Sequence, residues 1–273
     1  MALQASGSLS STDILTELNL PAGTSISSAD TRIKHLANKP TGSISSSDFY
    51  SRLPIRLVDQ VTAGPLGLVT THTFSSVDFG PAFTGRVLFA CIAISAENGA
   101  SILDQQTCTI AGNSAVGDDA GARTTQTNPD HALGAGLWYL SDEVNTSGDV
   151  VINWTSNSAD YISLFLLAAD VLGLPFDDDT TNWFPPGPSF IATSIAQTID
   201  IPADGFLIAS QAQSANETTT FTNATKRHSQ AFGNAMHNVA YDNKLASQTG
   251  RTITASWTTS RCAGGEARSF SEA

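Results

Sequence analysis

The residue types that most often perform catalysis are present in this chain, but their spacing matches no catalytic motif. No His-Glu-x-x-His pair occurs among the five histidines, which are His35, His72, His131, His228 and His237. The chain also has no Gly-x-Ser-x-Gly turn, no P-loop and no Gly-x-Gly-x-x-Gly fingerprint. Asp142 and Glu143 suit glycoside hydrolysis, but a sequence does not fix the roughly 5–10 Å carboxylate separation that this reaction needs. We therefore expect no catalytic residues and no enzymatic activity.

The cysteines and the densest group of carboxylates have no metal-ligand spacing either. Cys91 lies in an apolar run, which predicts a buried free thiol, although a bridge to Cys108 across neighbouring strands is an alternative. The third cysteine is Cys262. The acidic triplet 177–179 has the oxygen ligands that Ca²⁺ prefers, but no EF-hand register follows it, and we expect it to be solvated. The sequence therefore predicts no metal and no cofactor.

Two aromatic residues in a proline-rich stretch are the candidate ligand-binding pair. Trp183 and Phe184 precede Pro185 and Pro186 in the range 173–189, whose composition indicates a linker. Such aromatics can pack two neighbouring domains together, or they can form an exposed platform for a sugar or a protein partner. Packing is the expected role, and ligand binding is the alternative.

The charge balance excludes several classes of partner. Of the 273 residues, 13 are Lys or Arg and 25 are Asp or Glu, which gives a formal net charge of −12. Such a surface argues against sequence-independent nucleic-acid binding and against docking onto anionic membranes. The apolar run 161–169 is too short to span a bilayer, so no membrane insertion is expected. Residues 1–11 have neither a basic start nor an apolar run, which predicts synthesis in a bacterial cytoplasm without a signal peptide.

From residue 57 onward, the apolar pattern is typical of short strands separated by turns. The run 86–94 is dense in β-branched and aromatic residues, which indicates a buried central strand. A polar, glycine-rich loop is expected over 113–130. The expected strands of this part are 71–79, 86–94, 107–111, 132–140, 150–155 and 161–169. Their number and punctuation predict a mainly β fold, a sandwich or jelly roll.

The same order of strands then recurs, which predicts tandem β-sandwich halves. The segments 197–202, 205–211, 219–223 and 250–258 follow the order of the first half, with 205–211 aligned to 85–91, and the more polar tail 265–272 takes the place of 161–169. Trp154 and Trp257 occupy matching places and are expected to anchor the two cores. The predicted division is an N-terminal segment 1–55, a first sandwich 56–172, the linker 173–189 and a second sandwich 190–273.

The N-terminal segment contains one short phrase three times, as SLSSTD at 8–13, SISSAD at 25–30 and SISSSD at 43–48. Each copy has a serine that can cap a helix and an aspartate three positions later that suits a capping box and the helix dipole. These residues are Ser10 and Asp13, Ser27 and Asp30, and Ser45 and Asp48. A proline follows each unit, so three short helices are expected. Helices this short are marginal alone, which indicates that they pack against a partner or against the rest of the chain.

Residues 6–53 resemble the N-terminal segment of many tailed-bacteriophage tail and fibre proteins, in which such repeats precede a β-rich body. The copy at 43–50 is the clearest, whereas the middle copy has Thr31-Arg32 where an apolar residue is expected. The resemblance implies a virion structural protein in a tail tip, fibre or other appendage, attached through residues 1–55. It also implies other virion proteins as partners, a homo-oligomer, and a host-surface polysaccharide or protein receptor. The alternative is a bacterial carbohydrate-binding or carbohydrate-degrading β-sandwich protein.

Overall fold

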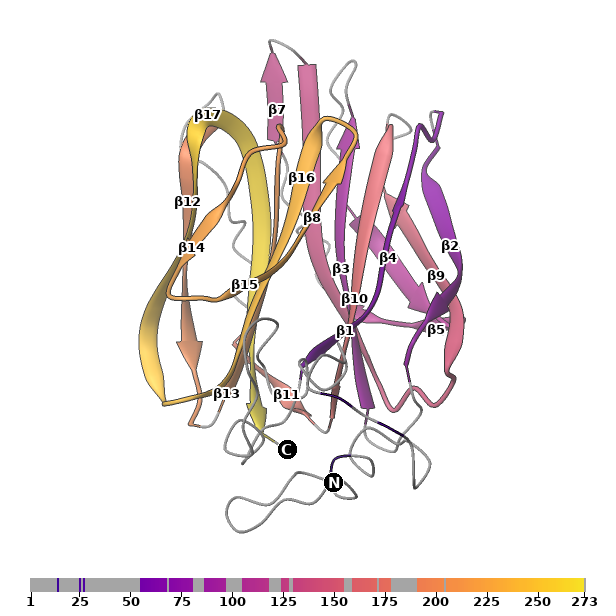
Figure 1. Ribbon diagram of the computed structural model, residues 1–273, viewed down its shortest axis with the longest axis vertical. Helices are drawn as coiled ribbons and strands as arrows, with labels where there is room; N and C mark the ends of the chain where they lie inside the picture. Colours follow the sequence, from indigo (N-terminus) through magenta and orange to yellow (C-terminus); the bar gives the residue numbers. More distant parts are fainter. Residues whose placement is uncertain are drawn as a thin grey trace.

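The computed structural model confirms that the chain is mainly β (Figure 1). It describes residues 55–67, 69–80, 86–96, 105–117, 124–127, 130–154, 159–170, 172–177, 191–203 and 205–272, together with Ile14, Ser25 and Ser27. The three expected N-terminal helices therefore lie outside the described residues, apart from these three isolated positions. Every strand pair in the described part is antiparallel.

The first half of the described chain forms two sheets. One has six strands in the order β1-β10-β3-β8-β6, with β7 also paired to β8, and the other has the order β2-β9-β4-β5. The strands are β1 (Arg56–Ala63), β2 (Thr71–Asp78), β3 (Arg86–Ala96), β4 (Gln105–Ile110), β5 (Asn113–Ser114), β6 (Val116–Gly117), β7 (Thr124–Thr127), β8 (Asp130–Ser141), β9 (Ser147–Trp154) and β10 (Tyr161–Asp170).

The second half forms one seven-stranded sheet that covers two layers. Its main order is β11-β17-β13-β16-β15, while β12 and β14 also pair with β17. The strands are β11 (Leu172–Asp177), β12 (Ile191–Ile201), β13 (Gly205–Gln213), β14 (Thr220–Thr222), β15 (Lys226–Phe232), β16 (Ala235–Leu245) and β17 (Gln248–Glu272).

The strand β17 joins the two layers of the second half because it bends. Its first part pairs with β12 and β14, and its last part pairs with β13 from Ala263 to Phe270. The register with β12 shifts between Ser256 and Arg261, where β17 turns (Figure 1). Ile253 from the first part and Ala267 from the last part lie in the same hydrophobic core. The two parts of this strand therefore face each other across that core.

The strands stack in four layers, with the two large sheets inside (Figure 1). The two inner sheets are β1-β10-β3-β8 and β11-β17-β13-β16-β15, and their contact is called the seam. Four phenylalanines pack in the seam, namely Phe89, Phe165, Phe206 and Phe270. The ring centroids of Phe89 and Phe270 are 5.0 Å apart. On its other face, each inner sheet packs against an outer layer, β2-β9-β4-β5 in the first half and β12, β14 and the first part of β17 in the second.

The predicted buried central strand is confirmed by β3, all of whose residues are buried between β10 and β8. Its apolar run is continuous because alternate side chains point into different cores. Leu88 packs toward the outer layer, whereas Phe89 packs into the seam. Trp154 and Trp257 are 3% and 6% exposed, each in the core below an outer layer, so the prediction that they anchor the cores is also confirmed.

One expectation about local structure is wrong. The range 113–130 contains β5, β6 and β7, so it is not a continuous loop. Glycines and polar residues are frequent in this range, and such residues are rare in strands, so the sequence does not predict these short strands. The predicted buried free thiol of Cys91 is confirmed, and the alternative bridge to Cys108 is not formed. The two cysteines belong to cores on opposite faces of β3. A side chain in the seam cannot bridge to one in the outer core without moving the strand.

Candidate functional site

Most of the sequence-predicted site residues lie outside the described residues, and no side-chain contact is assigned to them. Ser27 is the one such residue that the structure describes, and it is exposed and lies outside the strands. The predicted site residues outside the described part are Ser10, Asp13, Asp30, Ser45, Asp48, Trp183 and Phe184. The attachment role of the first segment and the ligand-binding role of the aromatic pair therefore stay predictions.

His237 on β16 has a serine hydroxyl at each of its two ring nitrogens. Its Nε2 lies 3.0 Å from Oγ of Ser210 on β13, and its Nδ1 lies 3.0 Å from Oγ of Ser163 on β10. The ring also contacts Phe165, with centroids 4.8 Å apart. Burial lowers the pKa of His237 to about 3, so the ring is neutral at physiological pH.

This serine–histidine–serine group joins the two halves and does not form a reactive centre. Ser163, Ser210 and His237 are all 0% exposed, so no substrate reaches them. A nucleophile and its base must meet a substrate atom at hydrogen-bond distance. The group instead satisfies three buried polar side chains across the seam, which would be costly if left unpaired.

A second buried polar group crosses the seam at β17. Nε of Arg268 donates to Oε1 of Glu266 at 2.6 Å, and the Leu137 amide of β8 donates to Oε2 of Glu266 at 2.7 Å. Cys91 lies nearby, where burial first and the charge of Glu266 second raise the pKa of its thiol. A raised pKa keeps the thiol protonated and unreactive. No group of three potential metal ligands occurs among the described residues.

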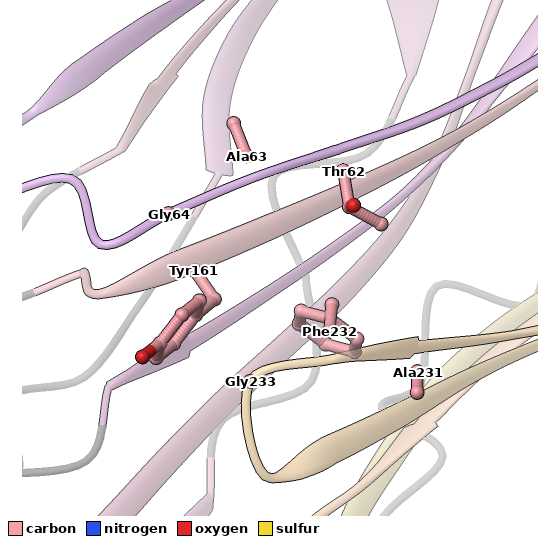
Figure 2. Close-up of a pocket in the computed structure, with 7 residues that line it drawn as sticks. All are labelled: Thr62, Ala63, Gly64, Tyr161, Ala231, Phe232 and Gly233. Atoms are coloured by element: carbon pink, nitrogen blue, oxygen red, sulfur yellow. The ribbon is translucent and has the colours of Figure 1, made fainter.

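An open pocket lies at the edge of the seam (Figure 2). Its volume is about 220 Å³. The first half contributes the end of β1 and the start of β10, and the second half contributes the turn between β15 and β16. The lining residues are Thr62, Ala63, Gly64, Tyr161, Ala231, Phe232 and Gly233.

The sequence alone does not reveal this pocket, because its walls come from three distant segments. A turn signal was present in Gly233-Asn234, between two runs that form the hairpin of β15 and β16. The two runs mix polar and apolar residues, and this pattern does not by itself predict strands. Without this hairpin, nothing in the sequence places residue 232 beside residue 161.

No protein-family model and no curated protein matches this sequence. Within the described part of the chain, there is no helix with the length and apolar character needed to cross a membrane.

Proposed function

We propose that this chain is a structural protein of a tailed-bacteriophage particle, located in a tail tip, fibre or other appendage. The observation that carries the proposal is the threefold serine–aspartate phrase of residues 8–48 ahead of a mainly β body. In this proposal, residues 1–55 attach to other virion proteins. The body binds the host surface, and weak contacts are multiplied by the number of copies in a homo-oligomer.

The described body supports a binding role better than a catalytic one. The two buried polar groups at the seam, around His237 and Glu266, are paired across it, and the pocket has no carboxylate, histidine or cysteine in its lining. The net charge of −12 disfavours nucleic acid as a partner.

We further infer that the body is a tandem repeat of one β-sandwich. The order of β1, β10, β3 and β8 in the first half matches the order of β11, the last part of β17, β13 and β16 in the second. The outer layers match in the same way, since β9 lies between β2 and β4, and the first part of β17 pairs with β12 and β14. This correspondence supports a duplication that placed two related inner sheets face to face.

The alternative is a bacterial protein that binds or degrades carbohydrate. Its distinguishing feature would be a monomer with hydrolytic activity on polysaccharide, and nothing in such a protein requires the serine–aspartate repeats.

Deletion of residues 1–53 from the full chain tests the proposal. We expect the shortened chain to keep its β circular-dichroism spectrum but to lose its place in the particle. The measurement is co-purification with tagged particles, with oligomer mass determined by light scattering. The full chain carrying Thr73→Val is the matched control, because Thr73 is exposed on β2, outside residues 1–55, and this variant should still assemble. Normal incorporation of the shortened chain into particles would contradict the proposal.

A further inference from the structure

We infer that the pocket at the edge of the seam binds one uncharged sugar ring. This inference deepens the proposed host-surface role and rests on it only for the source of the sugar, a host-surface glycan.

The pocket is held rigid because its walls belong to two different halves that are packed together. β1 and β15 are the edge strands of the two inner sheets on this side, and the Gln60 amide donates to the Gln230 side-chain oxygen between them. Figure 2 shows Tyr161 of the first half beside the turn at Gly233, with Phe232 next to it in the second half. A site with fixed walls binds without the cost of ordering loops.

Two glycines hold the Tyr161 ring in place. A Cβ atom on Gly64 would lie 2.2 Å from Cδ1 of the ring, and one on Gly233 would lie 2.5 Å from Cδ2. Any side chain at either position would therefore displace the ring. Gly233 also has a φ of +56°, in the left-handed region that favours glycine. The close backbone approach fixes the ring as a wall of the pocket.

The chemistry of the lining selects an uncharged, amphipathic ligand. None of the seven lining residues carries a charge, and the half-buried ring of Tyr161 together with the exposed Ala231 supplies an apolar surface. Thr62 is exposed, and within the described residues neither its hydroxyl nor that of Tyr161 has a hydrogen-bond partner. Hydroxyls that donate and accept beside an apolar surface match a sugar ring, which has apolar C–H faces and hydroxyl edges.

The volume of the pocket and the charge of the chain further limit the class of ligand. The volume of about 220 Å³ is below the roughly 300–1,000 Å³ of pockets for drug-sized ligands, so it suits a single ring. A uronate or phosphate would meet no cation in the lining and would also be repelled by a chain of net charge −12. A neutral hexose unit therefore fits better than an acidic one.

Saturation-transfer NMR on the purified full chain tests the inference. The probes are the methyl glycosides of glucose, galactose and mannose, with methyl glucuronide as the charged comparison. We expect saturable millimolar binding of at least one neutral glycoside and weaker binding of the glucuronide. Thr62→Val and Tyr161→Phe each remove one hydroxyl while keeping the shape, and each should weaken binding by about two- to tenfold.

Thr73→Val is the matched control, because Thr73 is an equally exposed threonine on β2, away from the pocket. It should leave binding unchanged. The inference is overturned if no neutral glycoside binds, if glucuronide binds as tightly, or if both pocket variants bind like the wild type. None of these results depends on residues 1–53, so loss of sugar binding and loss of particle assembly are separate outcomes.

Discussion

At the scale of single residues, His237 shows how the two halves depend on each other. Its ring nitrogens contact serines from β10 and β13, and the ring is fully buried. The pKa of His237 is lowered to about 3, whereas an unfolded chain has a histidine pKa of about 6.5. Between these values the unfolded state binds a proton that the folded state does not, so stability rises with pH in this window.

This linkage predicts a measurable pH dependence. From pH 7 to pH 5, His237 should remove about 2 kcal/mol from the free energy of unfolding, because each pH unit below the unfolded pKa costs about 1.4 kcal/mol. Urea unfolding of the wild type and of His237→Gln at both pH values measures this contribution as the difference between their pH dependences. His72→Gln is the control, since His72 is only partly buried and should contribute less. Equal pH dependence of wild type and His237→Gln would contradict the argument.

The candidate site could not be predicted at this scale, for a physical reason. The pocket and the seam groups join residues that are far apart in the sequence, as in the contact of Leu137 with Glu266. A histidine or a glutamate in one sequence has no visible partner, so its burial cannot be inferred. The motifs that sequence does display, the serine–aspartate phrases, concern a different part of the chain.

At the scale of elements, a continuous apolar run predicts both a strand and its burial, whereas a polar run does not reveal that its strand is buried. The run 86–94 predicted β3 because a strand covered on both faces needs no polar residues. The last part of β17 is equally buried and lies between β13 and β11, yet it carries Glu266, Arg268 and Ser269. Those side chains are tolerated because each has a partner, two of them in other strands.

The alignment of 205–211 with 85–91 pairs residues that face different cores. Aligning 205–211 with 85–91 places Ile208 opposite Leu88, but Leu88 faces an outer layer and Ile208 faces the seam. Leu207 is the residue of β13 that faces an outer layer as Leu88 does. Because side chains alternate along a strand, a shift of one residue exchanges the two faces. Sequence similarity alone cannot detect this shift when both faces of the strand are apolar.

The bend of β17 is held by Glu217, which gives an element-scale prediction. Oε2 of Glu217 accepts hydrogen bonds from the Thr258 hydroxyl and the Thr259 amide, both at 3.0 Å, and Oε1 pairs with Arg261 at 3.1 Å. Although desolvation alone would raise the pKa of Glu217, these hydrogen bonds and the Arg261 charge lower it to about 2. The contribution to stability is therefore present above the unfolded pKa, near 4.5, and is lost as pH falls toward 2.

Glu217→Gln should loosen the bend at neutral pH without unfolding the chain. We expect faster hydrogen exchange of the Thr259 amide in this variant, because a charged acceptor is replaced by a neutral one. The amide of Thr254, in the paired first part of β17, is the internal control and should exchange at the wild-type rate. Unchanged exchange at Thr259 would show that the bend is held by the core alone.

At the scale of the whole molecule, the seam should make the two halves unfold together. It buries aromatic rings from both inner sheets, and it contains polar groups whose partners lie in the opposite half. Separation of the halves would expose this apolar surface and leave Ser163, His237 and Glu266 without partners across the seam. Both costs favour one cooperative transition over two separate ones.

Fluorine NMR of the chain labelled with 5-fluorotryptophan can follow both halves at once. Trp154 reports on the core of the first half and Trp257 on that of the second, and Trp154→Phe and Trp257→Phe assign their signals. We expect both native signals to disappear at the same urea concentration. Phe89→Ala should lower this common midpoint for both signals, since Phe89 packs against Phe270 in the seam. Leu88→Ala is the matched control in the outer core, and it should also lower both midpoints if unfolding is cooperative. Two separate midpoints in the wild type, or a Leu88→Ala effect confined to Trp154, would instead identify the halves as independent domains that merely touch.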